Sequence, residues 1–400
     1  MDNMNRVYKS CFQLLTRYVR PGSERAFPNN RSILVRNISD INDISSRKTS
    51  TRQKQIVQEN SFRLKTHGKL DVDLFCNVEI HPPNPFEEME RSDGENNTFV
   101  ELSSTNIETT ELKNLNFVSE ANHNNDELYV TSSTDDTELC ENVHCTIETP
   151  LKFDISVKVR GSCSISNTEG GTLNVKSFLD DTPLTLHNIK SGDIDVMTAG
   201  DVVSSKLLQG NASLQTQGMG CITGDRLQGQ RFKVTSDAGN INIKTLYGTS
   251  SQFYSKQGSI TIGNCHGDCD CYLKNGNLKI DSLDGSLTAD VVSGDVEVQV
   301  TRHRNIDIQV LGKGDITLKL PEDIVSNVGI SGSDVHIDKS LNYTPMNPAL
   351  PNTSLSEYIG VIGKSDGQTD NFITIRSKSG AINIEKQDWF SSLNLGKLEH

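Results

Sequence analysis

One short pattern of apolar and polar residues recurs along the chain from Gly161 onward. A glycine is followed by a polar residue and then by two apolar residues that a single polar residue separates. Two alternating apolar residues predict a short β-strand with one buried face, and the glycine predicts a tight corner leading into the next strand. The clearest copies are Gly192–Val196, Gly239–Ile243, Gly258–Ile262, Gly276–Ile280, Gly294–Val298, Gly314–Leu318 and Gly380–Ile384.

The even spacing of the glycines indicates a repeat architecture. They stand at positions 200, 210, 220, 229, 239, 248, 258, 267, 276, 285 and 294. Strong copies of the pattern begin at positions 239, 258, 276 and 294, and weaker copies alternate with them. This alternation predicts two strands per coil of about 19 residues. A three-sided coil of about 28 residues is the alternative.

Stacked coils also explain how this chain can form a core. Only 34% of the residues are hydrophobic and 6% are aromatic, and one short strand alone buries too little surface to be stable. Stacking in register creates a continuous inner column of Ile, Leu and Val. We therefore predict a mostly β protein, with a parallel β-solenoid of short, glycine-punctuated strands over residues 151–340.

The charges are distributed unevenly over a chain whose net charge is −13. Residues 1–70 contain 14 basic and 5 acidic side chains, whereas residues 71–150 contain 2 basic and 19 acidic ones. An acidic body repels phosphate backbones, which argues against a nucleic acid partner. No apolar run approaches the roughly 20 residues that cross a bilayer, so no transmembrane segment is predicted.

Residues 1–60 are predicted to form a basic leader and a linker. Phe12, Leu15 and Val19 share one face of a predicted amphipathic helix, and Asp2 and Glu24 are the acids among the first 36 residues. The basic residues in that stretch are Arg6, Lys9, Arg17, Arg20, Arg25, Arg31 and Arg36. Such a start is typical of mitochondrial targeting. The alternative is a disordered basic tail on a cytoplasmic protein.

Two further regions flank the repeat. Residues 61–150 form an acidic, β-rich opening segment, in which alternating residues such as Leu70, Val72 and Leu74 predict strands separated by polar loops. Residues 341–400 contain a proline-rich loop, the last strands and a predicted carboxyl-terminal cap that includes Trp389 and Phe390. A solenoid needs such closed ends because a bare terminal coil offers an edge to other chains.

The segment Cys265–Cys271 brings three cysteines and His266 close together in sequence, which suggests a zinc or copper site. However, Gly267–Cys271 is also a copy of the repeat, which places Cys269 and Cys271 at its inward positions. Free cysteine packs well in a core, and no second ligand pair of the zinc-finger type follows. We predict core packing, with no metal or cofactor, and keep metal binding as an alternative function. Cys140, His144 and Cys145 make a weaker group.

A carbohydrate-active or carbohydrate-binding β-helix is a second alternative. Glycoside hydrolysis needs two carboxyl groups roughly 5–10 Å apart. The two outward-facing series that the repeat predicts each contain one acid, and no catalytic motif occurs elsewhere. These series are Asn242, Thr261, Lys279, Glu297 and Thr317, and Ser213, Gln252, Asp270 and Thr288. We therefore predict that the protein is not an enzyme, has no catalytic residues, and is a scaffold that binds a protein partner.

The repeat, together with the segment Thr146–Ile155, resembles the putative-adhesin β-solenoid family. The resemblance extends from about Phe62 to Leu395. It implies a parallel β-solenoid, and for the animal member of the family it implies a mitochondrial address. The family has no established catalytic residues, so the resemblance implies no active site.

Overall fold

A computed structural model describes residues 55–84, 97–105, 116–133, 142–179, 182–346, 356–364 and 369–387. All of these residues belong to one compact unit. The predicted targeting helix and the Trp389–Phe390 cap lie outside the described residues. A strand already begins at Gln55, inside the predicted linker.

The described residues form 24 strands of one hydrogen-bonded sheet system. The amino-terminal strands are β1 (Gln55–Arg63), β2 (His67–Leu74), β3 (Asn77–His81), β4 (Asn97–Ser104), β5 (Val118–Ala121), β6 (Glu127–Thr131), β7 (Val143–Glu148), β8 (Lys152–Val159), β9 (Cys163–Ser166) and β10 (Glu169–Ser177). The central strands are β11 (Leu184–Thr198), β12 (Val202–Thr216), β13 (Ile222–Ser236), β14 (Ile241–Ser255), β15 (Ile260–Asn275), β16 (Leu278–Ser293) and β17 (Val296–Lys313). The carboxyl-terminal elements are β18 (Ile316–Leu320), β19 (Ser326–Gly332), β20 (Asp334–Ile337), the 3₁₀ helix η2 (Lys339–Leu341), β21 (Thr344–Pro345), β22 (Ser356–Ile362), β23 (Phe372–Ser379) and β24 (Ala381–Lys386).

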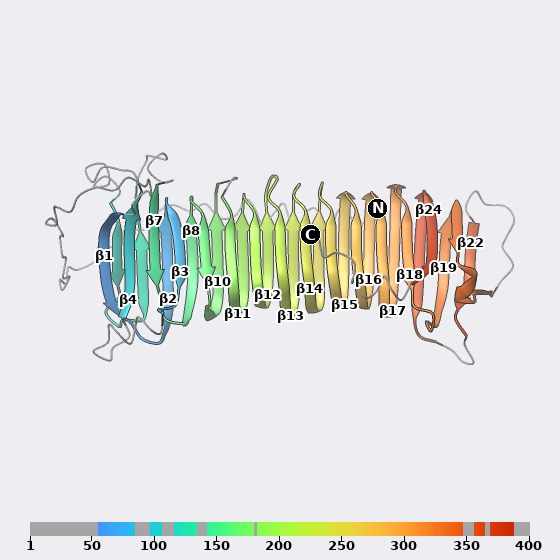
Figure 1. Cartoon of the computed structure of the whole chain (residues 1–400), viewed down its shortest axis with the longest axis horizontal. Helices are drawn as coiled ribbons and strands as arrows, with labels where there is room; N and C mark the ends of the chain where they lie inside the picture. The colour runs from blue at the N-terminus through green and yellow to red at the C-terminus, as the bar shows by residue number, and fades with distance from the viewer. Residues whose placement is uncertain are drawn as a thin grey trace, which may run out of the picture. The chain divides into compact units, whose positions relative to one another are not determined.

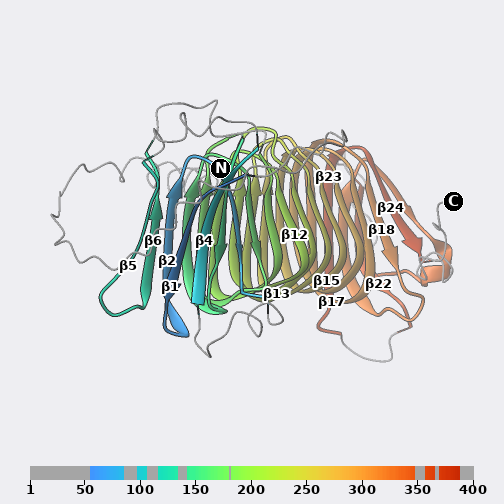
Figure 2. The same cartoon turned by 60° about the vertical axis from the view of Figure 1, so that its left-hand side comes forward.

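The strands β11 to β17 stack in parallel, one coil after another, as Figure 1 shows. Equivalent residues of neighbouring coils, such as Ile222, Ile241 and Ile260, lie directly in register. The predicted parallel β-solenoid is confirmed, and one coil takes up the predicted length of about 19 residues. The two short strands expected in each coil run into one another as a single long strand, because hydrogen bonding to the neighbouring coils continues through the corner (Figure 2).

Each coil contributes to two faces of the stack. We call the face formed by the first halves of β11–β17 the first face, and the face formed by their second halves the second face. Strand β9 pairs with the first half of β11 and β10 pairs with its second half, so both faces continue into the amino-terminal strands.

The core consists of inward columns that run through successive coils. On the first face one column is Ile222, Ile241, Ile260, Leu278, Val296, Ile316 and Ile382, and every member is 0–1% exposed. On the second face one column is Leu214, Val234, Phe253, Cys271, Ala289, Ile308 and Ile375. Repeated burial of such aliphatic side chains supplies the main stabilisation of a solenoid.

The corner glycines are required by the close approach of successive backbones. Gly294 has φ of +143°, and a Cβ atom added there would lie 1.9 Å from the carbonyl oxygen of Gly276 in the preceding coil. Any side chain at this position would therefore force the two coils apart. This contact explains why glycine recurs at the coil period.

The polar residue after each of these glycines has a separate role. Its side chain accepts a hydrogen bond from the backbone N–H of the equivalent residue in the next coil, as between Asn277 and Asp295 at 2.9 Å. The acceptors are Asp201, Asn240, Ser259, Asn277, Asp295 and Asp315. We call this series the corner ladder. It satisfies backbone donors at the corner, which explains the preference for Asp, Asn and Ser in the motif.

Coil order and chain order differ at both ends of the solenoid. The last strands, β23 and β24, lie between the β17–β18 coil and the strands β19 and β20, which precede them in the chain. In the same way β2 and β3 lie between β6–β7 and β8–β9. Figure 1 shows this as a break in the colour sequence near each end. The first and last coils of the chain are therefore each enclosed by coils made from more internal sequence.

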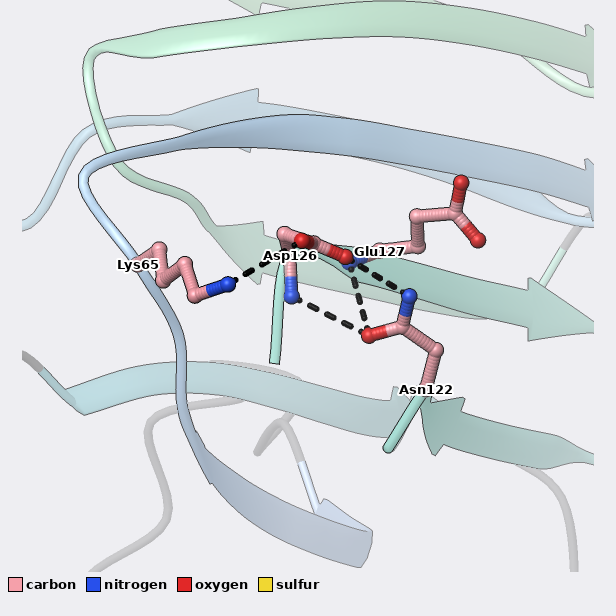
Figure 3. A network of polar contacts seen from close by, with 4 residues as sticks. All are labelled: Lys65, Asn122, Asp126 and Glu127. Atoms are coloured by element: carbon pink, nitrogen blue, oxygen red, sulfur yellow. Dashed lines mark hydrogen bonds and ion pairs between the residues drawn. The ribbon is translucent and has the colours of Figure 1, made fainter. Parts of the chain in front are cut away.

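The strands outside these coils are antiparallel. At the amino-terminal end β4 pairs with β7 and β1 with β4, while β5 pairs with β6. The turn from β5 to β6 is closed by Asn122, whose Oδ1 accepts hydrogen bonds from the backbone N–H groups of Asp126 and Glu127 (Figure 3). Its Nδ2 donates to Asp126 Oδ1 at 2.7 Å, and Lys65 Nζ lies 3.2 Å from Asp126 Oδ2. At the other end β22 pairs antiparallel with β19. A further coil or another chain would have to pair with the parallel repeat, and the antiparallel outer strands interrupt that repeat at each end.

Candidate functional site

The outward side chains of the second face form regular columns across the coils. In one column Tyr254 of β14 lies in register with Tyr272 of β15, and Asp290 of β16 follows. Tyr272 is 42% exposed. The coil period thus places two tyrosines and a carboxylate side by side on a flat sheet.

The neighbouring column adds two more carboxylates. Asp270 of β15, Thr288 of β16 and Asp307 of β17 are in register, so Asp270 and Asp307 are two coils, or about 10 Å, apart. Asp290 lies diagonally between them on the middle coil. We call Tyr254, Tyr272, Asp270, Asp290 and Asp307 the tyrosine–aspartate surface.

This arrangement corrects the expectation that the second of the two outward series contains a single acid. The first series, Asn242 to Thr317, is in register as predicted and holds only Glu297. The second series continues past Thr288 to Asp307, and Asp290 stands in the adjacent column. Asp307 follows Thr288 by 19 residues, so continuing the second series by one more coil period reaches it. Tyr254 and Tyr272 were not identified from the sequence as outward-facing neighbours, although they are one coil period apart.

Some acids of the second face are paired with arginines of the same chain. Asp307 Oδ1 lies 3.2 Å from Arg376 Nη1, and Asp268 forms an ion pair with Arg304. Within the described part of the chain, the side chains of Asp270 and Asp290 make neither a hydrogen bond nor an ion pair. The surface therefore carries negative charge that its own cations do not neutralise.

The environment of Asp290 shows the effect of this imbalance. Burial, followed by the negative charges of Asp307 and Asp270, raises the pKa of the Asp290 carboxyl, while Arg376 acts in the opposite direction. Burial and the charges of Asp270 and Asp290 also raise the pKa of the Tyr272 hydroxyl. An added cation would stabilise the ionised form of Asp290.

The cysteines of the Cys265–Cys271 segment face the core, as the repeat predicts for Cys269 and Cys271. Cys265, Cys269 and Cys271 are 0–1% exposed, and the Sγ atoms of Cys269 and Cys271 are 3.6 Å apart. Contact with Cys269, and then burial, raises the pKa of the Cys265 thiol well above its usual range. Thiolate, the form that binds metals and attacks electrophiles, is thereby disfavoured. Of the weaker group, Cys145 is buried and Cys140 lies outside the described residues.

No three His, Cys, Asp or Glu side chains in the described ranges are arranged to hold a metal ion. This includes the carboxylates of the tyrosine–aspartate surface. Over the same ranges, no helical segment has the length and apolar character needed to cross a bilayer.

A second constellation lies along the corner between the two faces. The rings of Tyr247 and His266 stack at 4.6 Å, and the Arg226 guanidinium lies 5.2 Å from the Tyr247 ring centroid. His266 Nδ1 is 3.3 Å from Asp284 Oδ2, which also accepts a hydrogen bond from Arg302 at 2.6 Å. Each member of this column contacts its neighbour in the next coil. We therefore assign the column a role in joining coils, and the tyrosine–aspartate surface is the stronger candidate for ligand binding.

Comparison with known proteins gives a family match over most of the solenoid. The model of the family described as Toastrack DUF4097 matches residues 104–385. A solved structure described as a "putative adhesin" from Bacteroides fragilis is 16% identical, with a TM-score of 0.34, and the match covers 67% of this chain and 98% of that one. Another from Parabacteroides distasonis is 13% identical, with a TM-score of 0.35, and that match covers 67% of this chain and 98% of the other.

Proposed function

Because the chain belongs to the Toastrack DUF4097 family, we propose that it is a non-enzymatic scaffold that binds a protein partner on the outer faces of its β-solenoid. The observation that supports this role is the tyrosine–aspartate surface. Tyrosine contributes much contact area for little loss of conformational freedom, and it is enriched where proteins bind one another. The strands beneath the surface are hydrogen-bonded on both sides, so a partner meets a preorganised face.

The chemistry of the surface also fits binding better than catalysis. The carboxylates lie on an open sheet, and the buried thiols are kept protonated. A catalytic site needs its groups held around a substrate from which water is excluded. A flat face, on which each column presents one side chain per coil, instead suits contact with an extended surface of a partner protein.

The experiment uses the full chain with a photo-crosslinking residue placed at Ser213 on the second face or at Thr261 on the first. We expect a discrete protein adduct from one face only, and competition by unlabelled protein. Adducts that are equal from both faces and are not competed would contradict the proposal. Turnover of a substrate by the purified protein would also contradict it.

We propose further that the protein acts in mitochondria, on the basis of the basic, amphipathic leader in the sequence. Import of the full chain into isolated mitochondria, followed by protease treatment, tests this location. A protected product shortened before Ser61 supports it. A full-length, protease-sensitive chain contradicts it and favours the cytoplasm.

One observation favours a carbohydrate ligand as a second candidate. Aromatic side chains next to carboxylates can stack on a sugar ring and accept hydrogen bonds from its hydroxyl groups. Tyr272 and Asp290 offer this combination. Titration with neutral oligosaccharides tests the candidate, which requires saturable binding that Tyr272→Ala removes.

A further inference from the structure

The second face already pairs its carboxylates with guanidinium groups. Arg376 forms an ion pair with Asp307 at 3.2 Å, and Arg304 forms one with Asp268. Asp270 on β15 and Asp290 on β16 present the same carboxylate chemistry, and no cation from the described part of the chain forms an ion pair with either. Tyr272 lies beside both, in the same strand as Asp270 and in register with Asp290.

We propose that the tyrosine–aspartate surface binds an extended, arginine-containing segment of a protein partner, with its guanidinium groups on Asp270 and Asp290 and against the ring of Tyr272. This proposal rests on the proposed scaffold function and specifies the chemistry of its partner. Arginine is the appropriate cation because its planar group pairs with carboxylates and also stacks on aromatic rings.

The spacing of the surface fits an extended peptide. Asp270 and Asp290 are one coil apart and two residues apart along the strands, which corresponds to about 8 Å. In an extended chain, side chains two residues apart point to the same side and are separated by about 7 Å. A segment with arginine at alternate positions therefore matches the two carboxylates without bending.

The charge favours a cationic ligand over a neutral one. The two unpaired carboxylates repel one another and Asp307, and only a cation relieves this repulsion on binding. A neutral sugar would leave both charges unneutralised. The surface is also rigid and half-exposed, which allows a side chain to approach from solvent.

The test uses the full chain and a fluorescein-labelled peptide of alternating serine and arginine, followed by fluorescence anisotropy. We expect saturable binding that weakens as salt is added. The double variant Asp270→Asn, Asp290→Asn should lower the affinity at least about tenfold, and Tyr272→Ala about threefold. The matched control is Asp195→Asn, which removes one charge from the same column four coils earlier, where no tyrosine accompanies it.

Thermal unfolding establishes that each variant is folded, and Asp290→Asn removes a repulsion with little change in side-chain size.

Absence of saturable binding, or an equal loss of affinity in Asp195→Asn, would overturn the proposal. Binding of cellotetraose that Tyr272→Ala abolishes, with no binding of the arginine peptide, would assign the surface to carbohydrate instead. If the peptide fails while crosslinking at Ser213 still yields a competed protein adduct, only the arginine proposal fails. If the peptide fails and neither Ser213 nor Thr261 yields a competed adduct, the scaffold function fails as well.

Discussion

The carboxylate of Asp315 accepts a hydrogen bond at 2.8 Å from the backbone N–H of Ala381, although the two residues are 66 positions apart in the chain. Every other step of the corner ladder joins residues 18 to 20 positions apart. The long step occurs because β24 lies against β18, in the place that the next coil would otherwise occupy. The ladder therefore identifies β24 as the true continuation of the repeat.

Replacing Asp315 with alanine should weaken the attachment of the last coil. The variant leaves the Ala381 N–H without its protein acceptor, and since the site is exposed, water compensates in part. We expect the free energy of unfolding to fall by about 1 kcal/mol, measured by urea denaturation. Asp315→Asn keeps an acceptor oxygen and is the control. Equal losses in the two variants would show that the hydrogen bond is not responsible.

Alanine at Gly294 should be far more costly than alanine at a glycine with open surroundings. At Gly294 the new Cβ would meet the Gly276 carbonyl oxygen at 1.9 Å, whereas at Gly218 no atom lies within 4 Å. We expect a loss of about 3 kcal/mol or more for Gly294→Ala and about 1 kcal/mol for Gly218→Ala, which retains only the cost of a positive φ. Thermal unfolding of both variants measures the difference. Similar melting temperatures would contradict a steric role for the corner glycines.

Protonation of His303 should destabilise the carboxyl-terminal coils at acidic pH. His303 is 8% exposed, lies in register with the corner glycine Gly285, and places Nε2 2.9 Å from the hydroxyl of Ser326. Burial lowers its pKa below the ordinary value of 6.5. The neutral form is therefore favoured by folding, so its stabilisation is complete above pH 6.5 and is lost as the pH falls toward the folded-state pKa.

In that window the free energy of unfolding should fall by up to about 1.4 kcal/mol per pH unit from this residue. His303→Gln removes the titrating group and keeps a donor near Ser326. Urea denaturation between pH 7 and pH 5 should therefore give a shallower pH dependence for the variant. Parallel curves for the two proteins would exclude His303 as the source.

The buried thiols should resist alkylation in the native protein. Burial raises the pKa of Cys163 to about 12, and Cys265 and Cys269 are only 1% exposed. Cys221 is partly exposed. With iodoacetamide at pH 8 and peptide mass spectrometry, we expect modification at Cys221 first, and at the other three only after urea is added. Rapid native modification of Cys269 would contradict its place in the core.

The fold was predictable because its information is local and repeated. Each copy, such as Gly276–Ile280, specifies a corner, a ladder residue and two inward side chains. The order of the end coils was not predictable, because the apolar–polar pattern allows either β19–β20 or β23–β24 to pair with the coil formed by β17 and β18. Both segments offer alternating apolar residues, and only packing over long sequence separations selects between them.

The candidate site was less accessible from sequence. Reading one mid-strand residue per coil found Asp270 but missed Asp290, which stands in the adjacent column. Asp307 lies 19 residues, or one coil period, after Thr288 and would have been found by continuing the series over one more coil. The burial of Cys269 and Cys271 followed directly from the repeat, since it depends only on side-chain alternation.

The enclosed position of the last coil has a consequence for how the protein is made. A ribosome delivers β18, β19 and β20 long before β23 and β24, so the central coils can assemble while the chain is still being synthesised. The carboxyl-terminal end of the stack cannot be completed at that stage, because β23 and β24, which lie beneath β19 and β20, have not yet been translated. Strands β23 and β24 thus complete the stack from within. A chain truncated before residue 372 would lack the coil that lies between β17–β18 and β19–β20.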